Sequence, residues 1–490
     1  MNMFMKKNNI NQTDYGLLCL YYIRLCSDLN VIIPFESSNT SNCRMWNTKE
    51  IKEMKNMEEN IRKIIDKVFN GEISADTVEN YMRNGRKINN VKHDEIEKKM
   101  PELRKEFAKY FECTEEEICI GDADFKDLNQ TEVPYVMVFG NANFSESKLK
   151  GLGKLQYIAG YADFQNSSVN DLGQLKHIGK HANFINSQVT SLGQLESIGG
   201  FANFSNSKVA DLGQLKSIEG FAIFGNSEIT DLGQLESIGM EADFSNSQVK
   251  NLGKLKSIEG DANFSNSHIE DFGQLEHIGG NANFRECYAN SLGKIKSIGG
   301  NADFLGSQVR DLGQLESIGG NVLFADSYKQ SYITSLGQLK SIGGNVDFSE
   351  TIVNDLGQLE YIGGNANFRQ NADRKSYITD LKNLKRIEGD ANFRISPVAN
   401  LGQLEYIGGN ADFTYSQVRD IERRKSLGRN AEFKKSTITD LGQLQKIESK
   451  EISGQDIGKA GFGIGIKLFD SASKFIKEAI NKIKEKFKEK

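Results

Sequence analysis

The sequence predicts an α/β solenoid, a coil of about 16 rungs with a parallel β-sheet along one face. The first supporting observation is a phenylalanine that recurs sixteen times, mostly at intervals of twenty residues. A period in this range is typical of solenoids. The second is a set of apolar residues inside each unit that a single unit could not bury without neighbours. The recurring phenylalanines are Phe125, Phe144, Phe164, Phe184, Phe204, Phe224, Phe244, Phe264, Phe284, Phe304, Phe324, Phe348, Phe368, Phe393, Phe413 and Phe433.

One unit, FANFSNSKVADLGQLKSIEG (201–220), shows how each coil is built. Its A-x-F pair (202–204) has the period of two that predicts a short strand. The L-x-x-L-x-x-I run (212–218) is spaced by three, which predicts a tight helical or 3₁₀-like turn on the opposite side of the coil. Asp211 stands where a side-chain oxygen could accept hydrogen bonds from the amides at the start of that turn.

A charged column supports this register. It follows one leucine of every unit, and its sign alternates at each step, so that in a stack each charge lies between two opposite charges. One exposed ion pair contributes only about 0.2–1 kcal/mol, and we interpret the column as structural. Its members are Lys176, Glu196, Lys216, Glu236, Lys256, Glu276, Lys296, Glu316, Lys340, Glu360, Lys385, Glu405 and Lys425.

The stretch ANFSNSKVADLGQLKSI resembles the leucine-rich repeat pattern LxLxxNxIxxLxxLxxL, and I-G-G-N-A-x-F is similar to the repeats of receptor L domains. The resemblance implies a curved, right-handed coil with a parallel sheet on one face, in a family that mainly binds other macromolecules. A pentapeptide-repeat β-helix is the structural alternative, because ADF and ANF fit its A(D/N)(L/F) core. That motif recurs every five residues, however, whereas here it occurs once in twenty.

The repeats divide the chain into four parts. Residues 1–47 form an N-terminal segment that is predicted to be partly helical, and residues 48–117 are predicted to be helices that cap the first coil. The repeat solenoid spans 118–448, and 449–490 holds a linker and a C-terminal helix. The apolar stretch GLLCLYYIRLC contains an arginine and lacks a cleavage site, so we interpret it as a core helix rather than a signal peptide.

The C-terminal helix is predicted to be basic and amphipathic. Residues 459–490 contain nine lysines and four acidic residues, a net charge of +5, which leaves −10 on the rest of a chain of net charge −5. Such a helix can cap the solenoid or dock on the same chain, and it can also lie on an anionic membrane. We leave these alternatives open. The candidate docking or membrane face is Leu468, Phe475, Ile476, Ile480, Ile483 and Phe487.

A candidate partner site interrupts the polar outer side of the predicted sheet. Most units place Asn or Asp at the outward positions around A-x-F, whereas several consecutive units carry aromatic or aliphatic residues there. An apolar cluster on a polar surface is typical of a protein-binding site, although the N-terminal helices could also fold back and cover it. The residues are Tyr161, His181, Ile185, Phe201, Phe221 and Ile223.

The sequence therefore predicts a non-enzymatic protein-binding scaffold that uses its outward sheet face and rim loops, with a membrane-associating protein as the alternative. No catalytic residue, cofactor or metal site is predicted, because no nucleophile has a base at a suitable spacing and no histidines have metal-ligand spacing. The mixed charge does not favour nucleic acid. Six cysteines without disulfide-like spacing favour a reducing, cytoplasmic location.

Overall fold

The computed structural model describes residues 48–84, 93–126, 132–324, 331–370, 377–419, 426–427 and 431–432. The chain divides into two compact units, Met1–Asn56 and Met57–Lys490. Helix α3 (Thr48–Phe69) crosses this division, and the repeats lie in the second unit. The predicted tail helix and the whole N-terminal segment 1–47 lie outside the described residues.

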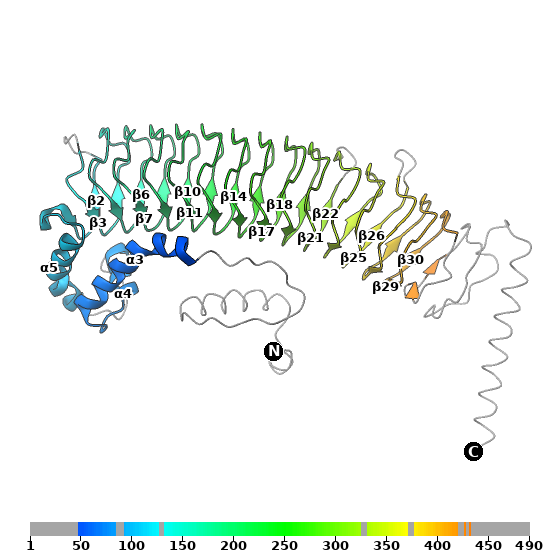
Figure 1. Cartoon of the computed structure of the whole chain (residues 1–490), viewed down its shortest axis with the longest axis horizontal. Helices are drawn as coiled ribbons and strands as arrows, with labels where there is room; N and C mark the ends of the chain where they lie inside the picture. Colours follow the sequence, from blue (N-terminus) through cyan, green and yellow to red (C-terminus); the bar gives the residue numbers. More distant parts are fainter. Residues whose placement is uncertain are drawn as a thin grey trace, which may run out of the picture. The chain divides into compact units, whose positions relative to one another are not determined.

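The repeats form a parallel β-solenoid of about 14 turns with two parallel sheets, A and B. The strands of each sheet follow one another along the long axis of the repeats (Figure 1). Each strand pairs with its equivalent in the next coil, as Ala202 does with Ala222. Sheet A consists of β1 (Ile118–Cys119), β3 (Met137–Val138), β5 (Tyr157–Ile158), β7 (His177–Ile178), β9 (Ser197–Ile198), β11 (Ser217–Ile218), β13 (Ser237–Ile238), β15 (Ser257–Ile258), β17 (His277–Ile278), β19 (Ser297–Ile298), β21 (Ser317–Ile318), β23 (Ser341–Ile342), β25 (Tyr361–Ile362), β27 (Arg386–Ile387), β29 (Tyr406–Ile407) and β31 (Ser426–Leu427).

Sheet B lies one short turn further along each coil. It consists of β2 (Ala123–Asp124), β4 (Ala142–Asn143), β6 (Ala162–Asp163), β8 (Ala182–Asn183), β10 (Ala202–Asn203), β12 (Ala222–Ile223), β14 (Ala242–Asp243), β16 (Ala262–Asn263), β18 (Ala282–Asn283), β20 (Ala302–Asp303), β22 (Val322–Leu323), β24 (Val346–Asp347), β26 (Ala366–Asn367), β28 (Ala391–Asn392), β30 (Ala411–Asp412) and β32 (Ala431–Glu432). The expected total of about 16 rungs is not established, because 420–425, 428–430 and everything after 432 lie outside the described residues.

The second sheet differs from the expectation of one sheet opposite a helical turn. In the unit 201–220, the L-x-x-L-x-x-I run holds a turn at 213–214 and then strand β11. Asp211 still organises the turn, since its Oδ1 accepts the N–H of Gly213 at 2.8 Å. Gly213 has φ +55°, which a glycine adopts without strain. The apolar residues are spaced by three because the chain turns at 213–214 before β11 pairs with the neighbouring coils.

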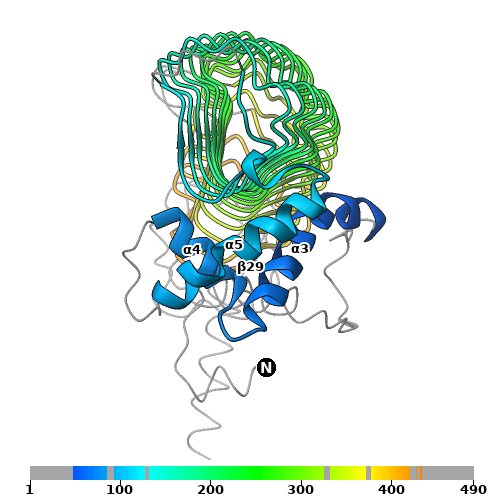
Figure 2. The ribbon, with the colours of Figure 1, turned by 90° about the vertical axis from the view of Figure 1, so that its left-hand side faces the viewer.

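The core of the solenoid is a continuous stack of phenylalanine rings. From Phe125 to Phe413, neighbouring ring centroids lie 4.6–6.0 Å apart and their planes are within 21° of parallel. Every ring in this stack is fully buried. Seen end-on, the coils lie almost on top of one another (Figure 2), which is what a constant register requires. The recurring phenylalanines therefore contact their equivalents in adjacent coils from Phe125 to Phe413, and Phe433 lies outside the described residues.

Three helices precede the repeats: α3, α4 (Ala75–Asn84) and α5 (His93–Tyr110), followed by the 3₁₀ turn η1 (Glu115–Glu117). Buried side chains of these helices form one cluster with Met137, Phe139 and Tyr157. The residues that alternate with these three, such as Val138, belong to the core of the solenoid, so the cluster lies on the outer side of sheet A. The expected cap over the end of the first coil is not established. The helices instead cover the outer side of the first strands of sheet A.

The alternating charges form ion pairs between adjacent coils. Each described pair joins a lysine to the glutamate of the preceding coil, for example Lys296 Nζ to Glu276 Oε2 at 2.7 Å. These contacts support the predicted register. The other pairs are Lys216–Glu196, Lys256–Glu236, Lys340–Glu316 and Lys385–Glu360.

Candidate functional site

The outer face of sheet B presents two columns of side chains. The inner column consists of the residue immediately before each strand, such as Asn301. The outer column consists of the second residue of each strand, such as Asp303. The residues between and after them, Ala302 and Phe304, are buried in the core. Both columns therefore face away from the core, as the A-x-F pattern predicts.

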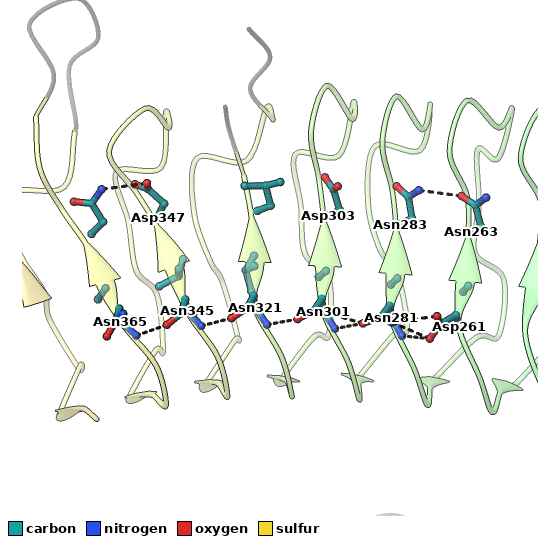
Figure 3. A pocket seen from close by; sticks show the side chains of 18 of the residues that line it. Asp261, Asn263, Asn281, Asn283, Asn301, Asp303, Asn321, Asn345, Asp347 and Asn365 are labelled. Carbon is teal, nitrogen blue, oxygen red and sulfur yellow. Dashed lines mark hydrogen bonds between the residues drawn. The ribbon is translucent and has the colours of Figure 1, made fainter. Parts of the chain in front are cut away.

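Side chains of the inner column are hydrogen-bonded from coil to coil. The Oδ1 of Asn281 accepts the backbone N–H of Asn301 at 2.8 Å, and Asn301 accepts the N–H of Asn321 at 2.7 Å. The same bond continues to Asn345, Asn365, Asp390 and Asn410 at 2.6–2.7 Å. Figure 3 shows the chain of bonds from Asp261 to Asn365. This amide ladder saturates a backbone donor in each coil and confirms that much of the polar surface is structural.

The outer column is stabilised in two ways. Each side-chain oxygen accepts the N–H two residues later, as Asn203 Oδ1 does from Ser205 at 2.9 Å. Neighbouring side chains also bond across coils, for example Asn263 Nδ2 to Asp243 Oδ1 at 3.0 Å. Asn and Asp are suited to both tasks because their short side chains reach the local backbone.

The structure places the six predicted residues on four consecutive coils, at or beside the strands of sheet B. We call Tyr161, His181, Phe201, Phe221, Ile185 and Ile223 the aromatic patch. Within it, the His181 ring lies 6.4 Å from the Tyr161 ring and 4.6 Å from the Phe201 ring. Phe221 is 39 % exposed. The apolar cluster of the N-terminal helices includes no residue of the patch, so among the described residues these helices do not cover it.

The aromatic patch interrupts the amide ladder. Asn141 Oδ1 accepts the N–H of Tyr161 at 2.9 Å, but the phenyl rings of Phe201 and Phe221 have no oxygen with which to continue the ladder. His181 restores a single step, since its Nδ1 accepts the N–H of Phe201 at 2.9 Å. These coils thus replace a stabilising polar residue with an exposed ring. The fold gives no reason for that replacement.

Met240 extends the patch and was not predicted. It is 44 % exposed and lies where other coils carry a glycine, such as Gly220. The sequence could have indicated this residue, because I-G-M-E (238–241) stands where most later coils carry I-G-G-N. A methionine suits an adaptable apolar surface because its side chain is flexible and polarizable.

A groove of about 950 Å³ continues along sheet B from β14 to β28, immediately after the patch. Its lining contains six carboxylates and no basic residue. Only one of these carboxylates has a described ion pair, Asp303 with Arg285 at 2.7 Å. The candidate face therefore combines an apolar patch with a longer acidic and amide-lined groove (Figure 3).

Residues with catalytic or metal-binding chemistry are dispersed. His177 belongs to β7 of sheet A, whereas His181 precedes β8 of sheet B. Burial lowers the pKa of both imidazoles, most evidently for His177, whose Nδ1 lies 2.7 Å from Ser197 Oγ. Cys287 is fully buried, and burial raises the pKa of its thiol. Within the described ranges, no three His, Cys, Asp or Glu side chains are placed to hold a metal ion.

Other predicted contact regions fall outside the described residues. They are the C-terminal face Leu468, Phe475, Ile476, Ile480, Ile483 and Phe487, and most of the two rim loops that are inserted after Phe324 and Phe368, at 325–330 and 371–376. In the described part of the chain, no helix combines the length and apolar character needed to cross a membrane.

Comparisons of the chain with models of protein families, with curated proteins and with solved structures found no match. The stacked coils of about 20 residues show that the chain is a repeat protein. No family match supports the resemblance to leucine-rich repeats.

Proposed function

We propose that this chain is a non-enzymatic, leucine-rich-repeat-like scaffold that binds another protein through the outer face of sheet B. The single observation that carries the proposal is the aromatic patch, where partly exposed rings stand in place of the side chains that form the amide ladder from Asp261 to Asn410. Natural interfaces are enriched in Phe, Tyr and Met at their centres and have polar rims. The patch has this composition, with the amide ladder and the groove beside it.

The proposed partner anchors an apolar segment on the patch and places basic residues along the groove. Six carboxylates without a basic residue in the lining create a negative potential that would steer a positively charged surface. The three described cysteines are free, in keeping with the proposed cytoplasmic location.

Replacing Phe201 and Phe221 by Asn should abolish partner capture. Asn occupies this position in coils that carry the ladder, so the variant should fold and gain ladder hydrogen bonds. Interface aromatic anchors are each worth about 2 kcal/mol or more, and their joint loss should weaken binding at least about a hundredfold. The measurement is quantitative capture of binding proteins by the immobilised full chain, with thermal unfolding as the check on folding.

A matched control removes aromatic residues from the outer side of the other sheet. Tyr361 and Tyr406 lie on the outer side of sheet A, where most coils carry Ser, so Tyr361→Ser with Tyr406→Ser should leave capture unchanged. Equal capture by the Phe201→Asn, Phe221→Asn variant and the unmodified chain would refute the proposal.

A further inference from the structure

A second aromatic surface lies on the third side of the coils, between sheet B and the corner that leads to sheet A. Tyr288, Tyr332 and Tyr377 are 49 %, 50 % and 51 % exposed. We call them the tyrosine row. Most other coils carry polar residues at the equivalent position, such as Lys208 and Gln248. The fold therefore does not require an aromatic side chain there.

The three tyrosines occupy one register position despite unequal inserts between them. The residue after each one, Ala289, Ile333 or Ile378, is fully buried in the core. The residue three positions after each tyrosine pairs with its equivalent in the next coil: Ser291 with Asp311, Ser335 with Asp355, and Asp380 with Asn400. The S-Y-I-T sequence after each insert thus returns the chain to register.

Consequently the tyrosines recur at every second coil. Gln308 occupies the same position in the coil between Tyr288 and Tyr332, and Ile352 does so between Tyr332 and Tyr377. Since adjacent strands are about 4.8 Å apart, two coils separate successive rings by about 9.6 Å. Three exposed rings at equal intervals form a linear platform along the solenoid.

Two of the three rings have a neighbour from the preceding coil on one face. The Arg310 guanidinium lies over the Tyr332 ring, 5.2 Å from its centroid, and His268 stacks on Tyr288 at 5.3 Å with an angle of 11° between the planes. In the coils from Tyr288 to Tyr377, an exposed polar side chain lies two residues after the tyrosine or its equivalent, on the same side of the coil. These residues are Asn290, Arg310, Thr334, Asn354 and Thr379.

We propose that the tyrosine row binds an extended, β-linked polysaccharide. A pyranose ring has an apolar C–H face that packs against an aromatic ring, and hydroxyl groups at its edge that hydrogen-bond to amide, guanidinium and hydroxyl side chains. In a ribbon-like β-linked chain, successive sugars are turned by half a turn, so every second sugar presents the same face. Two sugars of such a chain span about the same length as two coils.

The spacing favours a repeating polymer over a folded protein partner. Protein interfaces gather their anchors near one centre, in well-packed pockets. The row instead repeats one contact along a line, so that each added pair of sugars reaches a further tyrosine. Affinity should therefore rise with oligosaccharide length, because contacts after the first are made within one complex.

The test is retention of the full chain on insoluble cellulose and on chitin, followed by titration with soluble cello- and chito-oligosaccharides of two and six sugars. We expect retention on at least one polysaccharide, and binding of its hexasaccharide at least tenfold tighter than of its disaccharide. The two polymers distinguish glucose from N-acetylglucosamine as the repeating sugar.

The variant Tyr288→Gln, Tyr332→Gln, Tyr377→Gln should lose retention, and each single change should weaken it in part. Gln occupies this position in four other coils, at 188, 248, 308 and 417, so folding should be preserved. The control Tyr361→Ser, Tyr406→Ser removes one exposed and one half-buried tyrosine from the outer side of sheet A and should retain binding. The Phe201→Asn, Phe221→Asn variant should also retain it, which separates this site from the proposed protein-binding face. The proposal would be overturned if the full chain bound neither polymer, or if the triple variant bound as well as the unmodified chain. It would also be overturned if the triple variant lost protein capture but kept polysaccharide binding.

Discussion

Replacing Phe244 by alanine is expected to lower the free energy of unfolding by about 3–5 kcal/mol, the usual cost of deleting a buried aromatic side chain. Phe244 is fully buried and stacks on Phe224 at 4.7 Å and on Phe264 at 5.4 Å. The backbone of each coil is hydrogen-bonded to both neighbours, so the stack cannot close around the cavity. Urea unfolding followed by circular dichroism measures the change.

Phe272→Leu provides the matched control. Phe272 is also buried and packs edge-on against Phe264 at 5.1 Å, but the other coils carry leucine at its position. A substitution that restores the usual residue should cost less than about 1.5 kcal/mol. Similar losses for Phe244→Ala and Phe272→Leu would show that the ring stack is not a special source of stability.

The second large effect is expected from Gly313→Ala. Gly313 has φ +57°, and a Cβ there would collide with the carbonyl oxygen of Gly293 in the preceding coil. The left-handed conformation costs a residue with a Cβ about 1–2 kcal/mol, and the collision adds about 1–3 kcal/mol as overpacking. Gly313→Ala should therefore be among the most destabilising single changes in a turn.

Gly293→Ala isolates the two contributions. Gly293 has nearly the same φ, +58°, but a Cβ at this residue would meet no atom within 4 Å. It should show the conformational cost alone. Both variants are compared by urea unfolding, and equal losses in the two would contradict the close approach of adjacent coils at this corner.

The sequence predicts the stacking of coils because the phenylalanine period is directly visible. The second sheet could not be predicted in the same way. A strand of sheet B such as β10 is followed by a buried phenylalanine, so that A-x-F alternates, whereas β11 of sheet A contributes the single buried apolar residue Ile218 and shows no such alternation. Strand β11 is defined by its pairing with neighbouring coils, which the spacing of Leu212, Leu215 and Ile218 does not reveal.

The position of the N-terminal helices could have been predicted from outward residues. Met137, Phe139 and Tyr157 are apolar where later coils carry Ser or Gly on the outer side of sheet A. These residues mark the surface that the helices cover. Their outward direction can be recognised only once sheet A is known. The sequence therefore predicts helices before the first coil but does not reveal that they pack on the outer side of sheet A.

The two aromatic surfaces differ in how visible they are. The aromatic patch could be predicted because Tyr161, Phe201 and Phe221 lie at regular twenty-residue intervals in a column of Asn and Asp. The tyrosine row was not, because inserts of unequal length separate its members. Its register is clear only once the residues after each insert are seen to pair with the next coil.

The interaction surfaces proposed here depend on coils stacked at constant register, and distances between labelled coils test this most directly. Gln214 and Gln314 are five coils apart, and Gln174 and Gln358 are nine coils apart, all four on the exposed corner of the solenoid. Pulsed dipolar measurements between nitroxides, attached by a chemistry that does not modify cysteine, should give about 24 Å and about 43 Å, in proportion to the number of coils. Distances that do not increase with the number of intervening coils, or broad distributions for both pairs, would contradict the stacked solenoid and remove both proposed binding surfaces.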